Sequence, residues 1–194
     1  KGSQATQSFT AGVTGESSFQ LELFKPETIF ALLLGQSDVT LFTFEFPEVG
    51  FEFLYRQSVP IIGPLVGTFS GKFFGGLDLG FGYDTRGLSQ FLDNFNPASL
   101  LNGFFLNDVD PATGQDRDEA YFGVELAVGA GIDLGIAKAG VEAGFAATIL
   151  FNFADLDRDT KIRADELAAN LIANSYNPIS VFDVSGKLEI FLRA

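Results

Sequence analysis

Long runs in which apolar residues alternate with small or polar ones dominate this sequence. Within 68–84 the odd positions are mainly Phe, Leu and Tyr, whereas the even positions are mostly Ser, Lys, Asp and Gly. The same period of two occupies 122–136 and 141–153. Because successive side chains of a strand point to opposite faces, this period predicts long β-strands, each with one apolar face.

The pattern also predicts how two of these long runs connect and which shorter elements accompany them. The two runs at 122–136 and 141–153 are expected to form a hairpin around a turn at 137–140. Further strands are expected at 19–24, 39–46, 49–55 and 181–192, with loops at 60–64, 94–97 and 107–119. Helical patterns are few, at 26–34, 88–92 and 164–173. The sequence predicts an all-β fold of long antiparallel strands, as a sandwich or a curved, barrel-like sheet, with two or three short helices.

Glycines on the second face of these strands require an explanation, since glycine weakens a strand interior. A second layer that packs closely there is one interpretation, and strong bending of the strands is another. Strands that span a membrane are a third, disfavoured by the absence of Trp and by only 4 Tyr residues.

A chain of 194 residues is long enough for one domain with a substantial core. We expect a polar N-terminal segment at 1–18, which could serve as a strand-exchange arm, and a single β-rich domain at 19–194. Since the first residue is Lys1, we expect a mature product or a piece of a longer protein. The longest apolar stretch, 29–34, is far shorter than the roughly 20 residues of a membrane-spanning helix.

Missing residue types exclude several function classes. The sequence contains no His, Cys, Met or Trp, so it cannot build a Ser-His-Asp triad, a thiol nucleophile, a zinc site with His or Cys ligands, or a disulfide. Any metal site must use oxygen ligands, which favour Ca²⁺ or Mg²⁺. A net charge of −13 and the lack of a basic patch argue against nucleic-acid binding. Paired carboxylates could support glycoside hydrolysis, but we interpret them as solvent-facing charges and expect no enzyme.

One segment, 155–166, has the spacing of a calcium-binding loop. Asp155, Asp157, Asp159 and Glu166 occupy positions 1, 3, 5 and 12 of an EF-hand loop, and the carbonyl of Lys161 falls at position 7. A tightly curled loop of this kind turns three alternate carboxylates inward, and Glu166 at the start of the next helix closes the oxygen shell. The sequence therefore predicts a Ca²⁺ site at these five residues.

The loop also departs from the EF-hand pattern. Thr160 stands at position 6, where Gly is usual, and Arg163 at position 9 cannot be a ligand. A predicted strand precedes the loop where an EF-hand has a helix. The alternative interpretation is a solvated acidic turn without metal, although four crowded carboxylates repel one another unless a cation is bound.

A second candidate for calcium lies in the acidic stretch 107–119. Its candidate ligands are Asp108, Asp110, Asp116 and Asp118, whose spacing matches no known loop. An ordinary polar loop is the alternative.

Three segments together carry a family resemblance: the sequences at 80–88 (GFGYDTRGL) and 55–64 (YRQSVPIIGP), and the loop at 155–166 with its continuation to 188. From about residue 39 to the end, the chain resembles a module of very large secreted or surface-attached bacterial proteins of the calcium-dependent repeat type. The loop is also similar to that of dockerins, which carry two copies where this chain has one. The resemblance implies an extracellular or cell-surface location, neighbouring modules and a mechanical or adhesive role.

We therefore expect a non-enzymatic, calcium-stabilised extracellular module. Residues 3–14 could pair with the sheet edge of a neighbour and build fibres or surface layers by strand addition. The alternative is a carrier of an apolar ligand, a lipid or pigment, in a cavity lined by some of the 23 Phe residues. Those side chains could equally fill the core without any ligand.

Overall fold

The structure is a computed structural model that describes residues 3–110 and 113–194. Its strands form two antiparallel sheets accompanied by short helices, so the predicted all-β class is confirmed. Parts of the expected segments 1–18 and 107–119 (residues 1, 2, 111 and 112) lie outside the described residues.

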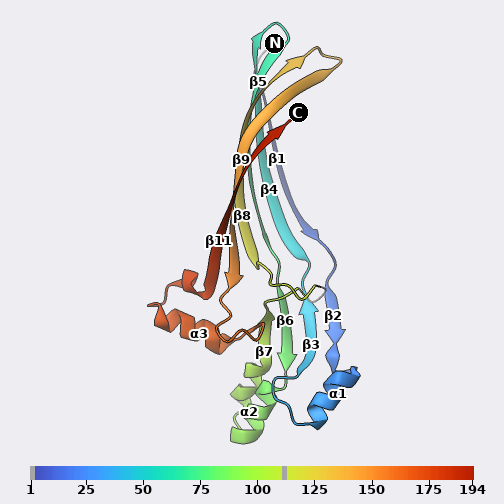
Figure 1. Ribbon diagram of the computed structural model, residues 1–194, viewed down its shortest axis with the longest axis vertical. Helices are drawn as coiled ribbons and strands as arrows, with labels where there is room; N and C mark the ends of the chain where they lie inside the picture. The colour runs from blue at the N-terminus through green and yellow to red at the C-terminus, as the bar shows by residue number, and fades with distance from the viewer. Residues whose placement is uncertain (1–2, 111–112) are drawn as a thin grey trace.

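Six strands build the first sheet, called here the long sheet, which curves along its length in Figure 1. Their spatial order is β1 (Gln4–Thr14), β4 (Glu48–Ile62), β5 (Leu65–Leu77), β8 (Ala120–Asp133), β9 (Lys138–Phe153) and β11 (Phe182–Arg193). All neighbours are antiparallel, and β8 and β9 form the predicted hairpin. Of the predicted architectures, an open curved sheet is the one that forms.

A small sheet lies at the lower end of the long sheet in Figure 1. Its order is β10 (Lys161–Ile162), β7 (Phe104–Asn107), β6 (Gly80–Asp84), β3 (Thr40–Glu45) and β2 (Ser18–Leu21). The helices gather at the same end: α1 (Pro26–Leu33), α2 (Arg86–Asn94), α3 (Ala164–Ala173) and the 3₁₀ turns η1 (Glu22–Phe24), η2 (Pro97–Gly103) and η3 (Pro178–Val181). The chain therefore leaves the long sheet after β1, β5 and β9 and returns through β4, β8 and β11.

The three predicted helices all form, and their ends follow from local sequence. Pro26 begins α1, where its missing N–H has no helical partner to lose, and Gly35 with φ of 68° follows the last turn. Phe95 ends α2 with φ of 50°. No helix among the described residues is long and apolar enough to cross a bilayer.

Several predictions about strand boundaries are wrong. The strand expected at 19–24 ends at Leu21, where η1 begins, and the turn expected at 137–140 lies between Asp133 and Lys138. The run 68–84 is two strands in different sheets, because the Asp78 N–H bonds the Glu119 carbonyl and the Phe46 N–H bonds the Leu79 carbonyl, each at 2.9 Å. These bonds turn the chain from the long sheet into the small one. The loop expected at 60–64 is shorter, since β4 continues through Ile62 and β5 begins at Leu65.

The N-terminal segment, expected to be available to a neighbour, forms β1 and pairs with β4 of its own chain over Gln4–Thr14. This pairing uses one side of β1. The other side is an outer edge of the long sheet.

One face of the long sheet is apolar across its full width, and no second layer covers it among the described residues. A row of directly opposed residues illustrates this face: Phe9, Phe53, Phe73, Val124, Ala147 and Leu188. The large side chains of this row are exposed, and Ile190 on the same face of β11 is 86% exposed. The alternation thus identified the apolar face correctly, but that face is open.

The other face is small and polar, and some of its glycines lie beneath aromatic rings of neighbouring strands. A Cβ at Gly123 would collide with the ring of Phe74, the residue directly opposite it on β5. Tyr121 lies in the same way against Gly76. These glycines therefore make room for rings within the sheet, and the close second layer considered above is absent from the described part of the chain.

The buried apolar core is small, and its two largest side chains, Phe105 and Ile162, lie in the small sheet at the lower end. Among the described residues, the buried apolar side chains are Phe105 on β7, Ile162 on β10 and Ala127 on β8. A Cβ at Gly82 would collide with the Phe105 ring, so this glycine permits close packing of β6 on β7. The core thus positions the acidic loop that follows β9.

Candidate metal centre

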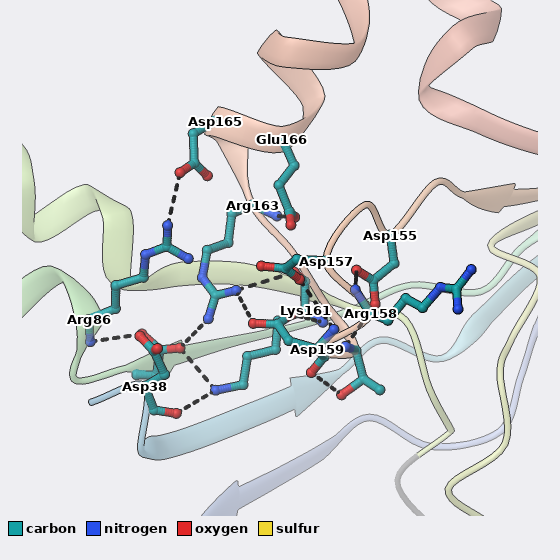
Figure 2. Close-up of polar contacts among 12 residues, drawn as sticks. Asp38, Arg86, Asp155, Asp157, Arg158, Asp159, Lys161, Arg163, Asp165 and Glu166 are labelled. Carbon is teal, nitrogen blue, oxygen red and sulfur yellow. Dashed lines mark hydrogen bonds and ion pairs between the residues drawn. The ribbon is translucent and has the colours of Figure 1, made fainter. Parts of the chain in front are cut away.

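The predicted calcium loop links β9 to β10 and curls as its spacing requires. Carboxylate oxygens of Asp155, Asp157 and Asp159 all lie within 4.8 Å of one another. Figure 2 shows the three side chains gathered at the loop, below the first turn of α3. Three of the five predicted ligands are therefore brought together by their side chains.

Hydrogen bonds within the loop fix this curl. Asp155 accepts the N–H groups of Arg158 at 2.6 Å and Thr160 at 2.8 Å, and Asp159 accepts the Lys161 N–H at 2.9 Å. Thr160 adopts φ of 68°, the left-handed conformation for which EF-hand loops use Gly. Because a Cβ makes that conformation unfavourable, Thr160 weakens the loop relative to one with Gly there.

Glu166, the predicted closing ligand, belongs to the N-terminal cap of α3 instead of to the aspartate triad. Its Oε2 accepts the Arg163 N–H at 2.8 Å, while its Oε1 is buried without a hydrogen-bond partner. Burial raises the pKa of Glu166, and the charges of the three loop aspartates raise it further, whereas the bond from Arg163 lowers it. Glu166 thus faces the loop charges with one unused acceptor.

Arg163 has a structural role that its loop position does not reveal. Its side chain is only 1% exposed, and its guanidinium pairs with Asp159 at 2.5 Å and with Asp84 at 2.8 Å. Figure 2 shows it extending from the start of α3 toward Asp159. Arg163 therefore neutralises part of the loop charge and ties the loop to β6.

Asp84, at the end of β6, is the point where these contacts meet. Its side chain is 0% exposed and also accepts from Lys161 Nζ at 2.9 Å and from the Arg86 N–H at 3.0 Å. Lys161 Nζ further donates to the Asp38 carbonyl at 2.7 Å. The sequence predicted that the Lys161 carbonyl oxygen binds the ion. That oxygen lies 3.4 Å from Arg163 Nη1. The Lys161 side chain pairs with Asp84.

We predict that Asp84→Ala lowers the free energy of unfolding by about 3–5 kcal/mol, because it leaves Lys161 and Arg163 buried without their shared carboxylate. Urea denaturation in chelator would measure this. Asp93→Ala, the same change at an exposed position of α2, should alter stability by no more than about 0.5 kcal/mol. Equal effects of the two variants would contradict a central role for Asp84.

A second acidic cluster lies where the two sheets join, and it differs from the predicted second site. Asp108 directly follows β7, and Glu119 directly precedes β8. Glu119 Oε2 accepts the Phe153 N–H at 2.7 Å, and Asn152 Nδ2 donates to both oxygens of Asp116 at 2.8 Å. The name junction cluster is used below for four residues: Asp108, Asp116, Glu119 and Asn152.

Two of the four predicted residues lie outside this cluster. Asp110 accepts the Thr113 N–H at 3.3 Å within its own turn, and Asp118 is exposed. Glu119 and Asn152 were not among the predicted ligands. Glu119 ends the acidic stretch 107–119, but Asn152 lies far away in sequence and approaches only through the pairing of β8 with β9.

The two buried carboxyls of the junction cluster are strongly perturbed. Burial raises the pKa of Asp108 to about 7, and the charges of Asp116, Asp155 and Asp183 act in the same direction. Burial also raises the pKa of Glu119 to about 8, against the bond from the Phe153 N–H, which lowers it. In the absence of a cation, these groups therefore favour their neutral forms.

This perturbation predicts a pH dependence of stability. Folded-state pKa values above those of the unfolded chain mean that the folded protein binds more protons between about pH 4 and 8, so its stability falls as pH rises through this window. In chelator, we expect a higher melting temperature at pH 5 than at pH 8. Glu119→Gln should reduce this difference, and an unchanged difference would contradict the assignment to Glu119.

Comparisons with known proteins found no relative: no family model, curated protein or solved structure matches the chain.

Proposed function

We propose that this protein is a non-enzymatic structural or adhesive module of the extracellular space, stabilised by Ca²⁺ and able to associate with further copies through its long sheet. The observation that carries this proposal is the apolar face of the long sheet, which no other part of the described chain covers. A sheet with one apolar face normally requires another layer against it. A partner molecule can supply that layer.

The size of the exposed surface supports association. The accessible surface of the chain is 12193 Å², against about 9,000 Å² for a compact protein of this mass. A stable interface removes roughly 800 Å² from each partner. The accessible surface beyond that of a compact protein is therefore more than sufficient for a specific contact between copies.

The edges of the long sheet offer a second mode of contact. β1 and β11 form its two edges, and β1 contains neither a charged residue nor a proline. Proteins usually protect such edges with charges, prolines or bulges, because an unpaired strand accepts another strand. Strand addition at β1 is thus compatible with fibres or surface layers.

The acidic loop supplies the calcium dependence in this proposal. Asp155, Asp157 and Asp159 would bind the ion with the Lys161 carbonyl, and Glu166 would join them by turning its unused oxygen toward the loop. The ion would stabilise the connection from β9 through α3 to β11. A loop weakened by Thr160 suits the millimolar Ca²⁺ concentrations at which extracellular modules bind.

We predict that millimolar Ca²⁺ raises the melting temperature, because an ion that binds only the folded state stabilises it by mass action. Differential scanning fluorimetry with Ca²⁺ and with chelator would measure the shift. Asp157→Ala with Glu166→Ala should lose the part of the shift that the loop ion contributes, whereas Asp93→Asn should retain the full shift. A shift of equal size in all three proteins would contradict the loop assignment.

A carrier of an apolar ligand is the alternative function, because the exposed phenylalanine side chains could contact such a ligand. Carriers usually enclose most of their ligand, however, whereas these side chains lie on an open face. A hollow of about 540 Å³ does lie against the long sheet, but its lining includes Thr6, Arg56, Thr68 and Glu142 of the polar face. This arrangement makes association the better supported function.

We predict that Leu188→Lys shifts the protein toward monomers in sedimentation velocity, because it places a charge on the apolar face. Ser185→Lys is the matched control, since it adds the same charge on the opposite face of the same strand. Equal association of both variants would contradict an interface on the apolar face. Native mass spectrometry of the wild type decides the alternative: copurified lipid in place of oligomers would favour the carrier.

A further inference from the structure

We infer that the junction cluster is a second, buried binding site for a hard divalent cation of the Ca²⁺ type, with Asp108, Glu119 and Asn152 as its central ligands. The site uses none of the predicted ligands of the loop 155–166. It lies between the sheets, because Asp108 follows β7 of the small sheet, whereas Glu119 directly precedes β8 of the long sheet and Asn152 belongs to β9.

Unused oxygen atoms carry this inference. Asp108 Oδ1, Glu119 Oε1 and Asn152 Oδ1 are all buried and have no hydrogen-bond partner. The side chains of Asp108 and Glu119 are only 7% and 2% exposed. Buried polar atoms without a partner are rare in folded proteins, and three acceptors in one cluster indicate a missing positive group.

The hydrogen bonds around the cluster fix the ligands in place. Glu119 is held through its Oε2 by the N–H of Phe153, which directly follows Asn152 in the chain. The Asn152 amide donates to Asp116, so its oxygen remains available. Asp108 is anchored by its backbone, because its N–H donates to the Thr160 carbonyl at 3.2 Å. Each ligand therefore keeps one oxygen unused while the rest of the residue is bound.

The surrounding charge favours a cation. Asp116 is hydrogen bonded to Asn152, and Asp183 pairs with Asn152 across β9 and β11. Arg117 is the nearby positive side chain, but its guanidinium donates to Glu45 at 2.7 Å and to the Asn107 carbonyl at 3.1 Å. The cluster thus retains excess negative charge. Carboxylate and amide oxygens are the ligands that Ca²⁺ and Mg²⁺ prefer, with water to complete the shell.

Counting bound ions in the full-length chain tests this inference. The protein is stripped with chelator, titrated with Ca²⁺ at pH 7.5 and analysed by native mass spectrometry and isothermal titration calorimetry. We expect two ions in the wild type, one in Glu119→Gln and one in Asp157→Ala. Asp118→Asn, which removes an exposed charge next to Glu119, should retain two.

Loss of folding is separated from loss of binding by a second measurement. Glu119→Gln replaces a buried charge with a neutral group of the same shape that can still accept the Phe153 N–H. We therefore expect its melting temperature in chelator at pH 8 to equal or exceed that of the wild type. A variant that melts earlier and binds one ion fewer would contradict a ligand role and indicate a structural one.

The outcomes also separate this inference from the proposed function. A wild type with one ion that Asp157→Ala removes and Glu119→Gln retains would overturn the junction site and leave the loop proposal intact. A wild type with one ion that Glu119→Gln removes and Asp157→Ala retains would support the junction site and overturn the loop site. No bound ion would overturn both, with protonated carboxyls at the junction as the explanation.

Discussion

The lower half of the molecule depends on one buried carboxylate, that of Asp84. It accepts from Lys161 in β10, from Arg163 directly after β10, and from the backbone at the start of α2. A carboxylate without water is stable only when charged and polar donors surround it. The chain meets this requirement by bringing the acidic loop, α3 and the end of β6 to one point. The geometry of the acidic loop is therefore a consequence of tertiary structure as well as of its own spacing.

The two sheets are stabilised in different ways. The small sheet has a core around Phe105 and Ile162, whereas the long sheet has one apolar face in water and, on the other, rings that lie over glycines of adjacent strands. Cross-strand contacts of this kind stabilise a sheet only modestly. The junction between the sheets, where the buried acidic residues gather, is thus the place where a bound ion would add most to the coherence of the fold.

Particular elements show what could be predicted from the sequence. The hairpin of β8 and β9 and the three helices were predictable, because alternation, Pro26 and the acidic start of α3 are local features. The break between β5 and β6 was not, since alternation continues through Asp78 and Leu79, and only bonds to distant residues turn the chain there. At the loop, spacing alone identified three clustered aspartates. Asp84 and Asn152 could not be assigned, because their partners are brought near by sheet pairing.

The open face of the long sheet has a consequence for unfolding. Denaturant sensitivity and the heat-capacity change both scale with the surface newly exposed when a protein unfolds. Much of the apolar surface of the long sheet is already in water in the folded monomer, so both quantities should be small for a chain of 194 residues. Burial of the face against a partner would make unfolding more cooperative. Association through this face would therefore give the long sheet the thermodynamic behaviour of an ordinary domain.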